Sequence, residues 1–413
     1  MQKWCVAGLM LCLCYGIASA ADVSELDRKI DILSREIEQL KLGEVAGETS
    51  VKTGLGPAAS KIYSQSKGLS LAGYGEMVYD RYADLKDNGT AGGKNDTIDY
   101  LRQVLYLGYK FSDSILMNSE IEFEHGSGGK NGEVSVEFAY LDFLMCPVAN
   151  FRTGMLLIPV GIYNQIHEPP TFFSVRRPEV EQKMIPTTWR ANGAGVFGQL
   201  GEQIRYEFYA SESLSATGSS GSFDESGIRD GRQEGSKAKM EDIALSGRLD
   251  YELQPGSLLG ASFFMGGTDQ GQTGANVGLL LWDLHSRLKL GQLELRALYA
   301  NTSLTNASSV TADFAAGTSQ YGYYVEAAYD ILPHFMPQSE QALMPFVRYE
   351  KFNTQAAVLS TVTASAANDK SYLVFGLCYL PHPNVALKVD YQNEILGDNS
   401  GVDSMRFAST FMF

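Results

Sequence analysis

Between residue 68 and the C-terminus, large apolar side chains alternate with polar or charged ones in segments of about ten residues. In residues 278–290, Trp282 and Leu284 fall on one face of such a segment, while His285 and Arg287 fall on the other. Successive side chains of a β-strand point to opposite faces, so this period of two predicts strands with one apolar and one charged face. We count sixteen such segments.

Two classes of all-β protein fit sixteen alternating strands, a large soluble sandwich or propeller and a transmembrane barrel. The apolar faces here suit lipid and the charged faces need water, which is the reverse of a soluble barrel. Many of the 22 Tyr and 20 Phe residues lie near predicted strand ends, as aromatic rings do at membrane–water interfaces. The sequence therefore predicts a 16-stranded antiparallel transmembrane β-barrel over residues 68–413.

The links between the predicted strands alternate in length, as in a barrel with short periplasmic turns and long external loops. The even-numbered links are short and comprise residues 112–114, 145–149, 201–202, 291–292 and 381–383. The odd-numbered links are longer and comprise residues 83–97, 162–192, 212–241, 302–319, 353–370 and 395–403. Residues 333–342 form an even-numbered link that is longer than this rule predicts. The even strand count places both ends of the barrel on the periplasmic side.

The C-terminal segment, SMRFASTFMF, is the strand predicted to close the cylinder. We expect Met405, Phe407, Phe411 and Phe413 to face lipid and Arg406 to face the lumen. A terminal phenylalanine on such a strand also resembles the signal that outer-membrane assembly machinery reads in porins.

The first twenty residues have the pattern of a secretory signal peptide. Lys3 precedes an apolar run, and Ala18-Ser19-Ala20 forms an A-x-A cleavage site. A transmembrane anchor is the alternative, but the apolar run is too short and no stop-transfer pattern follows. Together with the barrel pattern, this segment predicts a location in the outer membrane of a Gram-negative bacterium.

Residues 21–42 form a separate element, in which apolar residues recur at spacings of three and four: Val23, Leu26, Ile30, Leu33, Ile37 and Leu40. This is a heptad pattern and predicts a short periplasmic coiled coil. A single amphipathic helix is the alternative. Residue choice in the seam favours a dimer, although so short a coil specifies its oligomeric state weakly. Residues 43–67 are rich in Gly, Ser, Thr and Ala and are predicted to be a linker.

Composition excludes several functional classes. The net charge of -15 leaves no basic footprint for nucleic acid. Two cysteines, Cys146 and Cys378, remain after the signal peptide, and they form neither a disulfide framework nor a metal site. Residues 193–198 fit G-x-G-x-x-G, but strand-like sequence follows instead of a long helix, so we interpret them as the glycine-rich start of a strand. We predict no catalytic residues, metal or cofactor.

Sixteen strands are enough to leave an aqueous channel. The predicted link over residues 162–192 is stiffened by four prolines and carries apolar side chains, among them Phe172 and Trp189. A loop exposed only to solvent would gain nothing from that apolar surface. We therefore expect this link to pack against the inner wall and to form the pore constriction. An exposed loop that mediates trimer contacts is the alternative.

The same region resembles a known family. RTGMLLIPVGIYN and HEPPTFFSVRRPEVEQKMIPTTWRANGAGVFG, within about residues 150–198, are similar to the strand–loop–strand of the phosphate-selective porin (porin O and P) family. The order of signal peptide, short coiled coil and sixteen strands is similar as well. The resemblance implies a trimeric, passive outer-membrane channel. It names no substrate, because many members of that family have an unknown solute. We take the trimer over the dimeric seam, because packing between barrels should dominate so short a coil.

Charge along the lumen should select the solute. Strand alternation places these wall residues inward: Arg102, Glu120, Glu122, Arg152, Arg205, Arg248, Arg287, Arg296, Arg348, Lys388 and Arg406. The predicted constriction carries Glu168, Arg176, Arg177, Glu179, Glu181, Lys183 and Arg190, which is four cations against three acids. Rings of Arg and Lys favour anions, but these cations are opposed by acids. The mixed set predicts a weak anion preference and not strong phosphate selectivity. The alternative is that each wall charge only keeps the lumen hydrated and selects no solute.

These observations favour a passive porin for small hydrophilic solutes or anions, with outer-membrane lipid and further copies of the chain as partners. Two alternatives stay open. A structural tether would use the coiled coil to grip peptidoglycan or a periplasmic partner, which is compatible with a porin. A barrel enzyme acting on lipid or peptide would need a nucleophile beside a base, and the five histidines are scattered over different strands and links.

Overall fold

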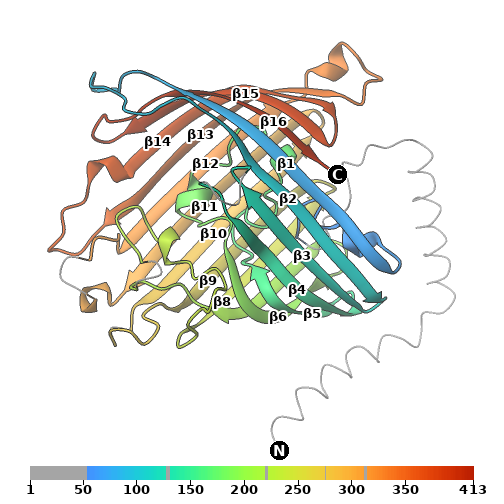
Figure 1. Ribbon diagram of the computed structural model, residues 1–413, viewed down its shortest axis with the longest axis horizontal. Helices are drawn as coiled ribbons and strands as arrows, with labels where there is room; N and C mark the ends of the chain where they lie inside the picture. The colour runs from blue at the N-terminus through green and yellow to red at the C-terminus, as the bar shows by residue number, and fades with distance from the viewer. Residues whose placement is uncertain (1–53, 127–130, 219–221, 275, 311–313) are drawn as a thin grey trace, which may run out of the picture. The chain divides into compact units, whose positions relative to one another are not determined.

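The computed structural model describes residues 54–413, except for 127–130, 219–221, 275 and 311–313. The predicted signal peptide (1–20), the predicted coiled coil (21–42) and residues 43–53 of the predicted linker lie outside the described residues. Within the described part, sixteen antiparallel strands pair in sequence order, and β1 pairs with β16 to close the barrel (Figure 1). The predicted barrel is confirmed.

Apolar and polar side chains alternate along the strands. The strands have the following bounds: β1 (Gly68–Tyr82), β2 (Thr97–Ser112), β3 (Ile115–Glu124), β4 (Val134–Cys146), β5 (Ala149–Leu157), β6 (Arg190–Leu200), β7 (Ile204–Glu212), β8 (Ile243–Gln254), β9 (Ser257–Gly267), β10 (Gly278–Leu290), β11 (Leu293–Thr305), β12 (Ser319–Tyr329), β13 (Ala342–Ala357), β14 (Asp369–His382), β15 (Val385–Leu396) and β16 (Ser404–Met412). The short helices are α3 (Lys61–Ser64), η1 (Pro169–Thr171), α4 (Val180–Lys183), η2 (Arg229–Gly231), η3 (Ala307–Ser309), η4 (Leu332–His334) and η5 (Ala366–Asn368). In the described part, no helix has the length and apolar character needed to cross a bilayer.

The link between β12 and β13 is the even-numbered link that the sequence left unexplained. It contains η4, and both of its ends are tied to one carboxylate. Asp330 Oδ1 accepts hydrogen bonds from the backbone N–H of Leu332 at 3.1 Å and of Leu343 at 3.0 Å. The extra residues therefore form a closed, ordered turn.

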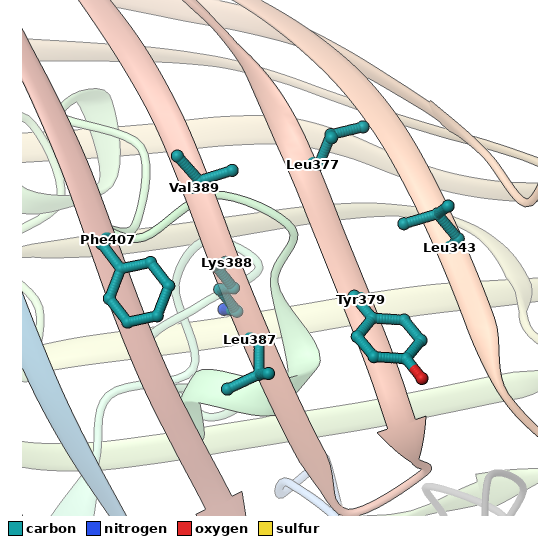
Figure 2. Close-up of a pocket in the computed structure, with 7 residues that line it drawn as sticks. All are labelled: Leu343, Leu377, Tyr379, Leu387, Lys388, Val389 and Phe407. Atoms are coloured by element: carbon teal, nitrogen blue, oxygen red, sulfur yellow. The ribbon is translucent and has the colours of Figure 1, made fainter.

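The two faces of the sheet differ as the alternation predicts. On β15, Leu387 and Val389 stand on the outer face beside Phe407, while Lys388 between them points to the inside (Figure 2). Leu387 is 40% exposed and Lys388 is 1% exposed. The shallow apolar hollow in that view opens on the outer, lipid-facing side, so it is not a solute site.

The C-terminal strand has the predicted orientation. Phe411 and Phe413 are exposed on the outer face, and Arg406 is buried on the inner one. Both phenylalanine rings lie over glycines of β1, where a Cβ would come within 2.7 Å of Phe411 at Gly75 and within 2.9 Å of Phe413 at Gly73. Small residues on β1 thus let the closing strand pack its aromatic rings.

Replacing Leu284 with arginine is expected to destabilise the folded barrel by about 2–4 kcal/mol, because a charge near the bilayer midplane is poorly solvated. Leu284 lies on β10 with 55% of its surface exposed. The matched variant Leu85→Arg changes a leucine that is 59% exposed in the loop after β1, and we expect an effect under about 0.5 kcal/mol. Urea titration in lipid vesicles measures both. Equal effects would contradict a lipid-facing Leu284.

Candidate channel constriction

The link between β5 and β6, residues 158–189, folds into the barrel, and we call it the inner loop. The sequence predicts this link over residues 162–192, whereas in the structure it begins at residue 158, after β5, and ends at residue 189, because β6 begins at Arg190. Its apolar side chains are buried against inward-facing residues of the strands from β9 to β15. Trp189 is 1% exposed, and its ring centroid lies 4.4 Å from that of Phe264 on β9. An apolar loop docked on the inner wall necessarily narrows the bore.

Two buried polar side chains hold the neck of the inner loop together. Glu181 accepts hydrogen bonds from the backbone N–H of Ile162 (2.8 Å) and Tyr163 (2.6 Å), and from the hydroxyl of Tyr324 on β12 (2.6 Å). Asn164 donates to the carbonyl of Trp189 at 2.9 Å and accepts from its N–H at 2.6 Å. Burial raises the pKa of Glu181 to about 7. Glu181 is 0% exposed and bonded on both oxygens, so it is a structural acceptor of the loop.

Glu168 has a similar structural role at the other side of the inner loop. Its carboxylate accepts hydrogen bonds from the backbone N–H of Ala58 (3.2 Å) and Ala59 (2.9 Å), and it is 1% exposed. Burial raises its pKa to about 7. Its neighbour His167 contacts Glu120 of β3 at 3.0 Å. Of the seven constriction residues predicted from sequence, Glu168 and Glu181 thus serve the fold of the loop.

The arginines of the predicted constriction face the wall formed by β1, β2 and β4. Arg176 pairs with Asp80 at 2.6 Å, and Arg190, at the start of β6, pairs with Glu137 at 2.7 Å. Arg177 lies in the electrostatic field of Arg102, and burial lowers its pKa. One nitrogen of its guanidinium has no hydrogen-bond partner among the described residues.

The remaining two residues of the predicted set are Glu179, which precedes α4, and Lys183, the last residue of α4. Both are half-buried. The candidate constriction therefore lies between the arginine side of the inner loop and the acidic wall of β1 to β4.

All of the predicted wall cations point inward, but most are engaged by carboxylates. The pairs are Arg102 with Glu76 (2.7 Å) and Glu122 (3.1 Å), Arg152 with Asp142 (2.7 Å), Arg248 with Asp250 (2.9 Å), Arg205 also with Asp250, Arg296 with Glu294 (3.3 Å), Arg348 with Glu326 (3.0 Å) and Glu350 (2.7 Å), and Arg406 with Asp390 (2.6 Å). Arg287 instead lies opposite another cation, Arg296, in the β10–β11 register. Lys388 donates to the carbonyls of Pro169 (2.6 Å) and Phe172 (2.6 Å), so it binds the inner loop. The wall charges thus support the loop as well as line the lumen.

Sequence reasoning missed two arginines of the link between β7 and β8, residues 213–242, which we call the clamp loop. Arg229 donates to the carbonyls of Gln182 (3.1 Å) and Thr187, and Arg232 donates to the carbonyl of Thr188 at 2.8 Å. Burial, then the nearby Arg232, lowers the pKa of Arg229 to about 9. The two arginines fasten the end of the inner loop. The available signal was the set of apolar residues Leu214, Phe223 and Ile228 in this largely polar link, all of them buried.

Arg229→Ala is expected to speed amide hydrogen exchange in residues 182–188 by about tenfold or more, because hydrogen bonds from a charged donor contribute roughly 1.5–3 kcal/mol. Lys237→Ala, in an exposed part of the clamp loop, is the matched control and should leave that exchange unchanged. Mass-spectrometric exchange on the reconstituted protein measures both. Unchanged protection in Arg229→Ala would show that the clamp loop does not hold the inner loop.

A second buried cluster lies on β8 to β10. His285 contacts Asp283 at 2.6 Å and Asp250 at 2.9 Å. The hydroxyl of Ser262 donates to Asp283 and not to His285, so this serine is not paired with a base as a nucleophile would be. Asp283 also accepts from the N–H of Gly161 at 3.0 Å, which fixes the start of the inner loop.

Other chemistry-bearing motifs have structural settings. The glycines of residues 193–198 lie in β6, where Gly195 lets β7 approach closely, since a Cβ there would come within 2.0 Å of a carbonyl of Phe208. Cys146 and Cys378 are not joined in a disulfide. In the described part of the chain, no group of three His, Cys, Asp or Glu side chains is arranged to hold a metal.

Sequence comparison identifies the family of this chain. No family model matches the sequence. An uncharacterized protein of Aquifex aeolicus (strain VF5) is 38% identical over 376 residues, which cover 87% of this chain and 83% of that protein. This chain belongs to the family of that Aquifex protein.

Solved structures of low sequence identity share the fold. Salmonella typhi OmpF, in a complex with daunomycin, superposes with a TM-score of 0.55 at 14% identity over 84% of this chain and 98% of that one. The anion-selective porin from Comamonas acidovorans has a TM-score of 0.52 at 11% identity, over 84% and 100%. OmpT, an outer membrane protein of Vibrio cholerae, has 0.52 at 10%, over 85% and 99%. This chain thus has the fold of these barrels, and a closed barrel with an apolar outer face belongs in the outer membrane of a Gram-negative bacterium.

Proposed function

We propose that the protein is a passive outer-membrane channel through which small hydrophilic solutes diffuse. The observation that carries the proposal is the closed 16-strand barrel with a charged interior and an apolar inner loop docked inside it. A barrel of this size leaves room for water, and a loop that narrows it sets a size limit. The solved structures of similar fold include the anion-selective porin from Comamonas acidovorans, which supports a channel.

The charges of the candidate constriction support a weak anion preference. The acidic wall residues Glu76 and Glu122 both pair with Arg102, which compensates part of their negative charge. Glu168 and Glu181 are turned onto backbone N–H groups, as described above. Arg177 and Arg287 have no ion pair with a described residue, so their positive charge acts on the solute. The resemblance to phosphate-selective porins stays a prediction, because unopposed arginines in series are few.

Planar-bilayer recording of the purified full-length protein tests this proposal. We expect stepwise conductance and a reversal potential, in a KCl gradient, displaced toward that of chloride. Arg177→Gln should move the reversal potential toward that of potassium, whereas Lys237→Gln in the clamp loop should not. Folded, inserted protein without conductance would end the channel proposal. Clear cation selectivity of the wild type would end the anion preference alone.

We further propose that the channel is a homotrimer and that the predicted coiled coil binds peptidoglycan or a periplasmic partner. The trimer rests on the resemblance at residues 150–198. Deleting residues 21–42 should leave single-channel conductance unchanged and weaken envelope integrity under detergent stress. A deletion strain with an intact envelope would remove the tethering role, and monomers by analytical ultracentrifugation in detergent would remove the trimer.

A further inference from the structure

Residues 54–65, which the sequence predicts to be part of a linker, are folded against the inside of the barrel. We propose that they form an internal plug, which we call the plug segment, and that its seating limits flow through the bore. The proposal rests on the channel function above and adds an element to it. The segment leads directly into β1, so it enters from the end of the barrel where the short turns lie.

Apolar packing is the first support. Leu55 and Ile62 are each 1% exposed, and Ala58 and Ala59 are buried beside them. Leu55, Ala58 and Ala59 share one cluster with these inward-facing side chains of the wall: Ala72, Tyr74, Val104, Tyr106, Phe138, Tyr140, Leu156 and Tyr209. A linker that simply ran out of the barrel would be exposed to water along its length, whereas several side chains of this segment are buried against the wall. It therefore occupies lumen next to β1, β2, β4, β5 and β7.

Hydrogen bonds fix the plug segment to the inner loop. Ala58 and Ala59 donate their N–H groups to the carboxylate of Glu168, and Gly56 donates to the carbonyl of Gln165 at 3.2 Å. A Cβ on Gly56 would lie 2.5 Å from the Glu168 carboxyl carbon, so glycine is needed for this approach. The plug segment and the inner loop thus share one buried carboxylate.

Further bonds fix the plug segment to the wall. Asn118 of β3 donates to the carbonyl of Ala59 at 2.9 Å. Tyr63 donates to Asp142 at 2.6 Å and accepts from Arg152 at 2.8 Å. These anchors take up wall groups that would otherwise face the lumen, so they alter both the width and the charge of the bore.

The wall is shaped for the segment. Gly108 on β2 faces inward, and a Cβ there would come within 2.8 Å of Ile62. The segment is short and lies outside the strand ladder, so its release is a local opening that leaves the strand pairing intact. Flow should therefore depend on whether the plug segment is seated.

Two variants unseat the plug segment by independent means. Glu168→Gln replaces the shared acceptor by a neutral amide, and Gly108→Ala pushes on Ile62 from the wall. Glu202→Gln, in the exposed turn between β6 and β7, is the matched control. Each is made in a full-length protein whose native thiols are replaced (Cys146→Ser, Cys378→Ser). Ser60→Cys reports on the buried plug segment, and Ser64→Cys, at an exposed position, reports on reagent access.

We expect both unseating variants to accelerate labelling of Ser60→Cys by a water-soluble maleimide by about tenfold and to raise single-channel conductance about twofold. Ser64→Cys should label at the same rate throughout, and Glu202→Gln should match the parent protein. Folded variants with unchanged labelling and conductance would overturn the plug. If the two variants label faster but neither they nor the parent protein conduct, the segment is removable and the proposed channel is overturned.

Discussion

Replacing Trp189 with alanine is expected to undock the inner loop and to raise single-channel conductance, while the barrel stays closed. Trp189 is buried against Phe264, and its backbone is bonded to Asn164. Truncating a buried tryptophan costs about 3–5 kcal/mol. The strand ladder does not depend on this ring, so the loss falls on docking of the loop. Conductance in planar bilayers and amide exchange across residues 158–189 should both increase.

Trp282→Ala is the matched control for this experiment. Trp282 lies on the outer face of β10 and packs on Tyr299, with ring centroids 5.6 Å apart. Its removal changes the lipid-facing surface and should leave conductance and exchange of the inner loop as in the wild type. The account would be wrong if both tryptophan variants raised conductance equally, or if Trp189→Ala changed neither quantity.

Replacing Arg348 with alanine is expected to destabilise the protein by about 3–5 kcal/mol and to shift selectivity toward cations. Arg348 is 1% exposed and pairs with both Glu326 and Glu350. It also donates to the hydroxyl of Ser174 in the inner loop. Removing the cation leaves Glu350 buried without a counter-charge and leaves Glu326 only Arg296 at 3.9 Å, which is worse than removing the whole cluster. Urea titration and reversal potentials measure the two effects.

The neighbouring Lys351 provides the comparison for Arg348. It forms an ion pair with Asp369 at 3.1 Å, in which the two side chains are 29% and 41% exposed. Such pairs contribute about 0–1 kcal/mol, so Lys351→Ala should have little effect. The triple variant Arg348→Met, Glu326→Gln, Glu350→Gln should recover much of the stability lost in Arg348→Ala. A triple variant as unstable as the single one would contradict the explanation by unpaired buried charge.

The barrel could be predicted from sequence because its signal is local. Within each strand, apolar and charged side chains alternate, as at Leu387, Lys388 and Val389, so its two faces can be read from its own sequence. Short turns join strands that are neighbours in sequence. The orientation of Arg406 and Phe411 follows from the same rule. No contact between distant segments is needed to derive these features.

The interior could be predicted only in outline. Glu168 and Glu181 look like pore charges in sequence, because nothing local indicates that each accepts bonds from buried backbone N–H groups. Glu168 bonds to Ala59, which lies 109 residues earlier. The plug segment has the small-residue composition of a linker, and only Leu55 and Ile62 indicate burial. The clamp by Arg229 likewise depends on contacts between two long loops.

The central claim is that side chains of one strand divide between lipid and a loop-filled, charged interior. Spin labels at consecutive residues 297–302 of β11, in the protein reconstituted into lipid vesicles, test it most directly. We predict that accessibility to dissolved oxygen, which concentrates in lipid, peaks at Ala297, Tyr299 and Asn301 and falls at Leu298, Ala300 and Thr302. Peaks at the second set, or no period of two, would contradict the membrane barrel.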